Sequence, residues 1–360
     1  MNIKREIGSE FHTCHTSSKV HEMYDGWQFF LTGRTALDSI LKDIQSSKRV
    51  KTALLPAYCC HSMVLPFENN GIEVSYYDID LFQSYAIPSN VPSEKYDIIF
   101  AIDYYGLNVE AFERELDVLI LNNKDSAIIV DVTHSLFSSR TSFNKADYYF
   151  CSLRKWTGLL SGGMAIKKNG ILSKPGKESL KDFVLSRENA IKEKQLYLEN
   201  GGDKSSFLSK FSKAEELIEN DYAGYAIDET SKENFLKLDY ELLKIKRKNN
   251  FMYLAQNRDV FLENDLIPIA CTIDNEVPLV FPVIAKSSEI RDSVRKHLID
   301  NDIYCPVHWP LPNNMRFDCK ALDYSKRELS IVCDQRYDLV DMQRIIDVIK
   351  EYKPNGDRSY

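Results

Sequence analysis

The sequence lacks any long run of apolar residues. Its longest runs, at 127–130 and 279–285, are far shorter than the roughly 20 residues that a membrane-spanning helix requires, so no membrane span is expected. The first ten residues are charged and lack the apolar segment of a signal peptide. This start predicts a cytoplasmic protein.

Patterns typical of metal sites and of nucleic-acid binding are also missing. The eight cysteines include the adjacent Cys59 and Cys60 but no Cys-x-x-Cys spacing, which excludes a zinc knuckle or a thioredoxin-type site and predicts no metal. The net charge is −7, and the lysines and arginines are scattered rather than clustered, which disfavours a nucleic-acid partner. Small molecules are therefore the expected partners.

The chain does have length and a regular alternation of elements. Its 360 residues, with 44% hydrophobic content, suffice for one large domain and a smaller one. Between 27 and 166, helical stretches alternate with short apolar runs, which is typical of parallel strands joined by crossover helices. Strands are expected at 52–55, 73–78, 98–102, 127–130, 148–151 and 164–166. The sequence therefore predicts the α/β class, with a mostly parallel sheet sandwiched by helices.

The second half of the chain has a different pattern. Residues 174–248 are charged and helix-forming, which predicts surface helices and a linker. Strand-like runs follow at 266–273, 277–284 and 303–307, with helices at 287–301 and 339–352. We expect a large domain at 20–235 and a smaller C-terminal α+β domain at 236–360.

Three residues in the first half carry most of the chemical information. Asp131 directly follows an apolar strand, which places its carboxylate at the sheet edge where open α/β sheets bind ligands. A carboxylate that pairs with the protonated pyridine nitrogen of pyridoxal 5'-phosphate (PLP) lets this cofactor act as an electron sink. Lys155 lies just beyond the next strand, where it is placed to form a Schiff base with the aldehyde of PLP. His134 either contacts the cofactor ring or is a satisfied core histidine. Taken singly, Asp131 is readable as a turn residue and Lys155 as a solvated lysine.

A phosphate site is indicated near the start of the first helix. Gly33 frees the backbone for a close approach, and the N–H groups of Arg34, Thr35 and Ala36 lie at the helix start, where N–H groups lack intrahelical partners. A plain helix cap explains the same residues. Ser152 offers a hydroxyl to the same phosphate.

Taken together, these motifs resemble the DegT/StrS family of PLP-dependent sugar aminotransferases, over roughly residues 31–352. The stretches that carry the resemblance are Gly33-Arg-Thr-Ala-Leu, Pro56-Ala-Tyr-Cys-Cys60, Tyr77-Asp-Ile-Asp80, Asp131-x-x-His134, Ser152-Leu-Arg-Lys155, Gly162-Gly163 and Val307-His-Trp-Pro310. The resemblance implies the fold of PLP-dependent transferases of fold type I and a homodimer in which the partner subunit completes each active site.

The resemblance also implies roles for individual residues. Lys155 matches the lysine that forms the Schiff base, Asp131 the residue that pairs with the pyridine nitrogen, and His134 a residue near the ring oxygen. Thr35, Ala36 and Ser152 match the phosphate-binding residues. The sequence departs from the family where an aromatic residue usually stacks on the cofactor ring, because that position falls on Cys60, with Tyr58 beside it.

The implied reaction is transfer of an amino group from an amino acid such as glutamate to a keto-sugar, linked to a nucleotide, in surface polysaccharide or secondary metabolite biosynthesis. His308 and Arg336 are the candidate substrate-binding residues, because an arginine binds carboxylate or phosphate with two parallel hydrogen bonds. The alternatives are a class V PLP lyase, desulfurase or epimerase, with Cys59 or Cys60 as its catalytic cysteine, and a non-catalytic regulator or scaffold of the same fold. A PLP-dependent dehydratase of the same family is disfavoured, because it typically has histidine in place of Lys155.

Overall fold

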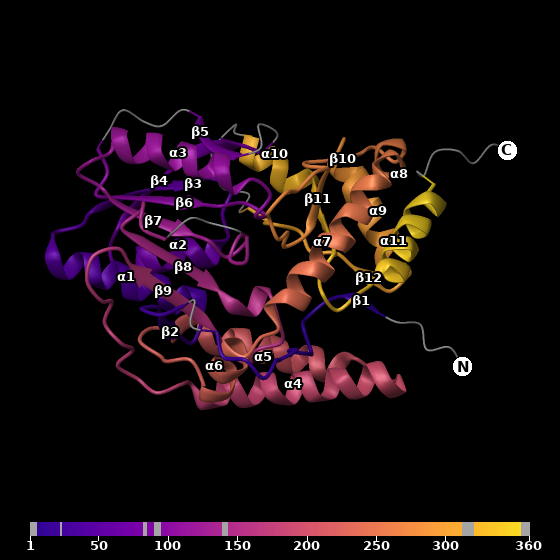
Figure 1. The fold of residues 1–360 in the computed structure, drawn as a ribbon, viewed down its shortest axis with the longest axis horizontal. Helices are drawn as coiled ribbons and strands as arrows, with labels where there is room; N and C mark the ends of the chain where they lie inside the picture. The colour runs from indigo at the N-terminus through magenta and orange to yellow at the C-terminus, as the bar shows by residue number, and fades with distance from the viewer. Residues whose placement is uncertain are drawn as a thin grey trace.

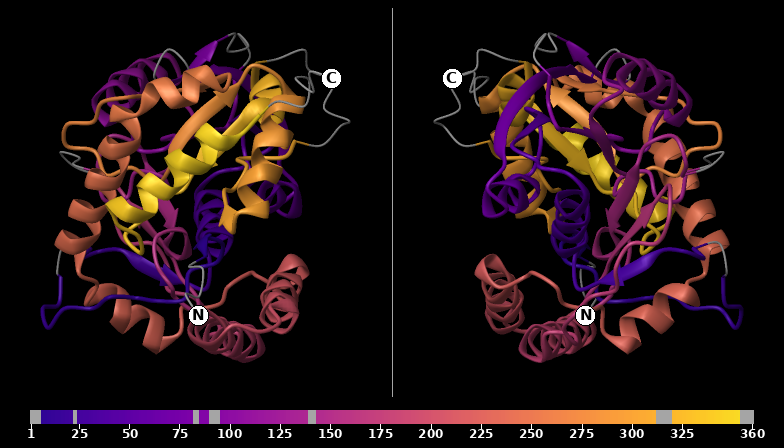
Figure 2. Two further views of the ribbon diagram at one scale, coloured as in Figure 1. Left: turned by 90° about the vertical axis from the view of Figure 1, so that its right-hand side faces the viewer. Right: turned by 90° about the vertical axis from the view of Figure 1, so that its left-hand side faces the viewer.

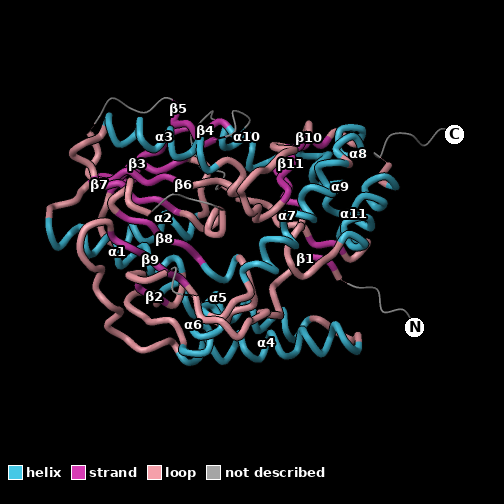
Figure 3. The backbone as a smooth tube through the Cα atoms, in the orientation of Figure 1, coloured by secondary structure: helices cyan, strands magenta, loops and turns pink. Residues whose placement is uncertain are grey.

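The computed structural model describes residues 6–21, 24–81, 95–138, 143–311 and 320–353, together with the backbone of 85–89. Its elements form two groups that lie side by side in Figure 1, a large sheet with its helices and a C-terminal group around α7, α9 and α11. Figure 3 shows that the strands of the two groups are separate. Among the described residues, no helix combines the length and the apolar character needed to span a membrane.

An eight-stranded sheet organises the larger group. In spatial order its strands are β2 (Gln28–Phe30), β9 (Gly163–Lys167), β8 (Tyr148–Ser152), β7 (Ala127–Asp131), β6 (Ile98–Ile102), β3 (Thr52–Pro56), β4 (Glu73–Asp80) and β5 (Tyr85–Ser89). The five strands from β8 to β4 are parallel to their neighbours, and antiparallel pairs occur only where β9, β2 and β5 join. The predicted class, α/β with a mostly parallel sheet, is confirmed.

Helices connect and cover these strands. They are α1 (Gly33–Ser47), α2 (His61–Asn69), α3 (Val109–Asn122), α4 (Lys181–Asn200), α5 (Ser205–Asn220) and α6 (Glu229–Leu236). The apolar residues of α1 recur at helical spacing and are buried against the sheet, whereas β7 is buried along its whole length, as expected of a strand covered on both faces. Helices α4 and α5 form a pair that projects from the base of the molecule in both views of Figure 2.

The C-terminal group is built on a small antiparallel sheet, β10-β11-β13. Its elements are α7 (Tyr240–Gln256), α8 (Arg258–Glu263), β10 (Leu266–Pro268), β11 (Phe281–Ala285), α9 (Ser288–Asp300), β12 (Ile303–Tyr304), α10 (Lys320–Arg327), β13 (Glu328–Ile331) and α11 (Leu339–Glu351). A short N-terminal strand, β1 (Ile7–Gly8), pairs in parallel with β12. The beginning of the chain therefore packs on its C-terminal group, which the sequence pattern did not indicate.

The strand predicted at 266–273 is confined to β10 (Leu266–Pro268), and the strands predicted at 277–284 and 303–307 are also shorter in the structure. Residues 277–280 precede β11, because the Val277 N–H donates to the Ser138 hydroxyl and the Leu279 N–H donates to the Tyr105 carbonyl. Residues 305–309 follow β12 and run to the edge of the large sheet. Both runs are apolar because they contact the larger group, not because they extend a strand.

Candidate active site

The predicted catalytic residues meet at the carboxyl end of the parallel strands. Asp131 is the last residue of β7, and Ser152 is the last residue of its neighbour β8. A single helical turn, Leu153–Lys155, follows and carries the lysine. Ser152 and Lys155 line a cavity of about 460 Å³, whose opposite wall includes His308 and Arg336 from the C-terminal group.

The turn that carries Lys155 is anchored by the residue after it. Trp156 is fully buried, and its indole N–H donates to the Thr133 carbonyl at 2.6 Å. The guanidinium of Arg247 lies 4.4 Å from the centre of the indole ring. Because Thr133 belongs to the loop after β7, Trp156 fixes the lysine turn relative to Asp131 and His134.

Asp131 is a buried carboxylate. Its Oδ1 accepts a hydrogen bond from the Thr133 N–H at 2.7 Å. Burial raises its pKa to about 6, although the hydrogen bonds from Thr133 and the positive charge of Lys155 act in the opposite direction. Lys155 itself is exposed to solvent, and its charge also lowers the pKa values of His134 and His308. Lys155 thus lies within electrostatic reach of all three residues.

His134 is held as a neutral ring with a defined tautomer. Its Nδ1 accepts the backbone N–H of Tyr105 at 3.2 Å, so its single proton lies on Nε2. Burial lowers its pKa to about 3, with a further contribution from Lys155. The rings of Tyr105 and Trp309 stack on it, with centroids at 5.6 and 5.4 Å. The structure thus gives His134 core packing and also brings it close to Lys155.

The residues predicted to bind phosphate fall into two pairs. Thr35 and Ala36 are fully buried and take part in the N-terminal cap of α1, where Thr32 accepts from the Thr35 N–H and the Ala36 N–H, and the Thr35 hydroxyl donates to the Tyr222 carbonyl. Gly33 lies against Ser152, since a Cβ on Gly33 would come within 3.0 Å of the Ser152 Cβ. The N–H groups of Gly33 and Arg34 come before the Thr35 and Ala36 N–H groups that bond Thr32. They lie in the first turn of α1, at the end of the helix nearest Ser152.

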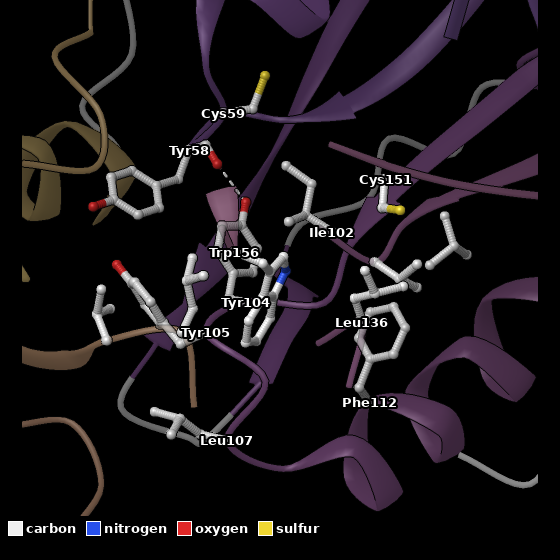
Figure 4. Packing of buried hydrophobic residues seen from close by; sticks show 14 of the residues in the cluster. Tyr58, Cys59, Ile102, Tyr104, Tyr105, Leu107, Phe112, Leu136, Cys151 and Trp156 are labelled. Atoms are coloured by element: carbon white, nitrogen blue, oxygen red, sulfur yellow. Dashed lines mark hydrogen bonds between the residues drawn. The ribbon is translucent and has the colours of Figure 1, made fainter. Parts of the chain in front are cut away.

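Tyr58 and Cys60 lie in an aromatic cluster and at a helix start, respectively. Tyr58 is fully buried, stacks on Tyr104 at 5.8 Å and accepts the Tyr104 hydroxyl at its carbonyl, as Figure 4 shows. The Trp309 ring lies 5.3 Å from it. Cys60 caps α2, and its Sγ accepts a hydrogen bond from the Ser62 hydroxyl. Neither residue lines the cavity.

His308 and Arg336 both line the cavity but differ in what they offer it. The Arg336 guanidinium binds Asp334 through Nε at 2.9 Å and Nη2 at 2.8 Å, and its remaining donors reach the carbonyls of Gly8, Ser9 and Glu10. Arg336 therefore ties the N-terminal segment to the C-terminal group. His308 bonds Ser330 through Nδ1, and among the described residues no group bonds its Nε2.

No protein-family model matches the sequence, and no curated protein matches it significantly. Solved structures match nearly the whole chain. PseC from Helicobacter pylori, an aminotransferase involved in the biosynthesis of pseudoaminic acid, is 14% identical with a TM-score of 0.65, over 96% of this chain and 97% of PseC. Spr1654 from Streptococcus pneumoniae, assigned as a sugar aminotransferase and solved in PMP and PLP forms, is 17% identical in its PMP form with a TM-score of 0.61, over 97% of this chain and 96% of its own. An aminotransferase of the DegT DnrJ EryC1 StrS type from Brucella abortus is 11% identical with a TM-score of 0.55, over 90% and 85% of the two chains.

The chain has the fold of these aminotransferases. The resemblance drawn from the motifs is thereby confirmed at the level of the fold. The long shared coverage includes the C-terminal group and also residues 174–248, a segment for which the sequence offered no motif.

Sequence reasoning missed several residues that line the cavity. Glu215 of α5 reaches it and forms an ion pair with Arg154 at 2.6 Å, so the helical segment between 174 and 248 contributes to the wall. Arg295 of α9 also lines it. No sequence signal singles out these residues, because charged side chains on amphipathic helices are ordinarily solvated.

Proposed function

We propose that this protein is a PLP-dependent aminotransferase that transfers an amino group from an amino acid, such as glutamate, to a keto-sugar linked to a nucleotide. One observation carries the proposal. Asp131 and Lys155 follow adjacent parallel strands and lie within electrostatic reach of each other, and Lys155 lines the cavity, in a chain with the fold of sugar aminotransferases.

The residues present fit the cofactor. Asp131 is buried and has no ion-pair partner among the described residues, and a protonated pyridine nitrogen would supply the missing positive charge. At the other end, Ser152 lines the cavity next to Gly33, where a helix N-terminus favours a phosphate. A side chain at position 33 would make a tight contact with Ser152, with its Cβ 3.0 Å from the Ser152 Cβ, so glycine leaves room there.

Bound PLP supplies an electron sink for the α-carbon of the amino donor. The amine of Lys155 would hold the cofactor, and it is the group placed to act as the base that removes the proton from that carbon. Asp131 would stabilise positive charge on the ring nitrogen of the cofactor. His134, neutral with its proton on Nε2, presents a hydrogen-bond donor beside the lysine. In the second half-reaction, the lysine returns a proton to the carbon that carried the keto group.

The charges of the cavity support an anionic substrate. Five cationic side chains line it: Arg154, Lys155, Arg247, Arg295 and Arg336. Arg247 is bonded to Gln335 and to two backbone carbonyls, and Arg154 and Arg336 are paired with acids. Arg295 forms no ion pair with any described residue and bonds only the Cys305 carbonyl, through Nε. Its remaining donors suit a carboxylate or a phosphate of the substrate.

The alternative of a cysteine desulfurase gains no support from the site. Cys59 is buried, and burial raises the pKa of its thiol well above its usual range, which opposes formation of the nucleophilic thiolate. Neither Cys59 nor Cys60 lines the cavity.

We further propose that the enzyme works as a cytoplasmic homodimer in surface polysaccharide or secondary metabolite biosynthesis. The motif resemblance supports this proposal. Sedimentation of the purified protein at micromolar concentration tests the dimer, and a monomer that is fully active would contradict it.

The decisive test of the proposed function is the absorbance spectrum of the protein after incubation with PLP. We expect a band near about 410–430 nm that disappears in Lys155→Ala and moves toward about 330 nm when glutamate is added. Lys168→Ala, which changes an exposed lysine outside the cavity, is the matched control and keeps the band. A protein that stays colourless with PLP would contradict the cofactor assignment, whereas a band that ignores every amino acid would favour the non-catalytic regulator.

A further inference from the structure

The small sheet contains a buried carboxyl group that the proposed reaction does not use. Glu328 is the first residue of β13 and is fully buried. It forms no ion pair with any described residue. Burying an ionised carboxyl group without a cationic partner costs folding free energy, so the hydrogen bonds of Glu328 decide how its charge is held.

Those hydrogen bonds connect Glu328 to the active-site histidine of the C-terminal group. Its Oε2 accepts the backbone N–H of His308 at 2.7 Å, and its Oε1 accepts the hydroxyl of Ser330. The same Ser330 Oγ lies 2.8 Å from Nδ1 of His308. Glu328 and Ser330 are two residues apart on one strand, so both side chains leave the same face of β13.

The direction of these bonds sets the tautomer of His308. A hydroxyl has one proton, so when Ser330 donates to an ionised Glu328, it can only accept from Nδ1, and Nε2 then lacks a proton. When Glu328 is protonated on Oε1 and donates to Ser330, the hydroxyl donates to Nδ1 instead, and the proton of His308 lies on Nε2. Burial keeps the pKa of His308 well below its usual value, so the ring stays neutral and only the position of its proton changes.

We propose that Ser330 couples the charge of Glu328 to the tautomer of His308, so that His308 Nε2 faces the substrate as an acceptor when Glu328 is ionised and as a donor when it is protonated. Ser330 and Glu328 are positioning residues, because they act through His308 and do not line the cavity. The consequence for the substrate rests on the proposed function: a hydroxyl of the sugar meets an acceptor in one state, and its keto oxygen meets a donor in the other.

Glu328, Ser330 and His308 form a hydrogen-bonded relay. Among these residues and the groups that face them, Glu328 is the group expected to titrate near neutral pH. Burial raises the pKa of Glu328 to about 8, opposed by Ser330, the His308 N–H and Arg291. The other groups that face the relay are Arg291 of α9, Tyr58 and Tyr105 at the edge of the large sheet, Cys305 after β12, and His134 and Lys155 across the cavity. Burial raises the pKa values of Tyr58, Tyr105 and Cys305, the last to about 12, and His134 has a pKa of about 3.

His134 provides an internal reference for this switch. Its Nδ1 accepts from a backbone N–H, which can only donate, so its tautomer cannot follow any titration. The rings of His134 and His308 lie 5.4 Å apart and share the same surroundings. A response of His308 that His134 does not show therefore reports the relay and not a general change of the site.

The test is nitrogen-15 NMR of the histidine rings in the cofactor-free protein, with the His308 signals assigned by their loss in His308→Gln. Between about pH 6 and about pH 10 we expect the proton of His308 to move from Nε2 to Nδ1, while His134 keeps its proton on Nε2. In Glu328→Gln, the amide oxygen replaces Oε2 and the amide nitrogen donates to Ser330. The volume is conserved, and His308 should keep its proton on Nε2 over the whole range.

Four further variants separate the effect of Ser330 and Glu328 from that of their surroundings. Ser330→Ala should abolish the pH response of His308, although the bond from the Ser330 N–H to the Pro306 carbonyl persists, and Ser330→Thr should restore it. Ser325→Ala removes another buried serine hydroxyl, bonded only to the Leu322 carbonyl, and should change nothing. Lys155→Ala should keep the switch and thereby excludes titration of the lysine as its cause.

A His308 tautomer that is the same at both ends of the pH range, or a response that survives in Glu328→Gln, overturns the proposal. Because the NMR measurement needs neither cofactor nor substrate, its failure is distinct from failure of the proposed function. If both hold, the kcat/KM for the keto acceptor in the wild type should change about 10-fold across the same pH range, and Glu328→Gln should remove that change.

Discussion

The two walls of the cavity use similar residue types in opposite ways. On the side of the large sheet, Asp131 accepts hydrogen bonds from Thr133 but forms no ion pair with a described residue, and Lys155 lines the cavity. On the wall formed by the C-terminal group, the Arg336 guanidinium donates its hydrogen bonds to Asp334 and to carbonyls of the N-terminal segment. His308 is bonded to Ser330. A charged residue beside a cavity is thus available for chemistry only if the fold has not already satisfied it.

The two histidines sharpen the same contrast. His134 is oriented by a backbone amide, which is a fixed donor, whereas His308 is oriented by a hydroxyl that can donate or accept. The backbone amide keeps the proton of His134 on Nε2, so this histidine offers the same hydrogen-bond donor under all conditions. The second arrangement can transmit the charge of a buried carboxyl group, Glu328, to the His308 ring.

The largest expected effect concerns the large-sheet wall. Asp131→Asn keeps the size of the side chain and removes its charge, so positive charge on the cofactor ring is no longer stabilised. We expect kcat/KM for the amino donor to fall by about 100- to 1,000-fold, as when one preorganised electrostatic group is lost. Asp147→Asn, at the opposite end of the same strands, is the control, because its carboxylate bonds the Ile128 N–H outside the cavity. Equal losses in both variants would indicate a purely structural role.

The second prediction concerns Arg336. Arg336→Ala leaves Asp334 as a buried unpaired charge and releases the carbonyls of the N-terminal segment. We expect the free energy of unfolding, measured by urea denaturation, to fall by about 3 kcal/mol. An unchanged stability together with a large rise in the KM of the amino donor would instead make Arg336 the substrate clamp that its sequence position suggests.

The smallest expected effect concerns Arg295 on the same wall. Arg295→Ala removes an exposed guanidinium that forms no ion pair with a described residue, so stability should stay within about 0.5 kcal/mol. The KM of the anionic substrate should rise about 10-fold, because a hydrogen bond to a charged group contributes on that scale. Steady-state kinetics at low ionic strength measure it, with Lys296→Ala, on the same helix and paired with Asp300, as the control. No change in KM would place the substrate's anionic group elsewhere.

Much of the large-sheet wall could be predicted from sequence because its determinants are local. The apolar run of β7 ends at Asp131, the run of β8 ends at Ser152, and parallel strands bring their carboxyl ends to one edge. The α/β class and six of its strands followed from the same periodicity. Residues 269–273, 277–280 and 305–307 were predicted as strand and lie outside the strands, because a run of apolar residues does not distinguish contact with a neighbouring element from pairing in a sheet.

The amino-acid sequence by itself determined the strand ends, the position of the lysine and the carboxylate on them, and the helix start beside Ser152, since each depends on a few consecutive residues. Only the tertiary structure decided which cationic groups remain available and which histidine nitrogens are hydrogen-bonded. Arg336 is bonded to carbonyls more than 300 positions away at the N-terminal end, and His308 is linked through Ser330 to Glu328, both on β13. Burial, pairing and tautomer depend on neighbours that only folding brings together.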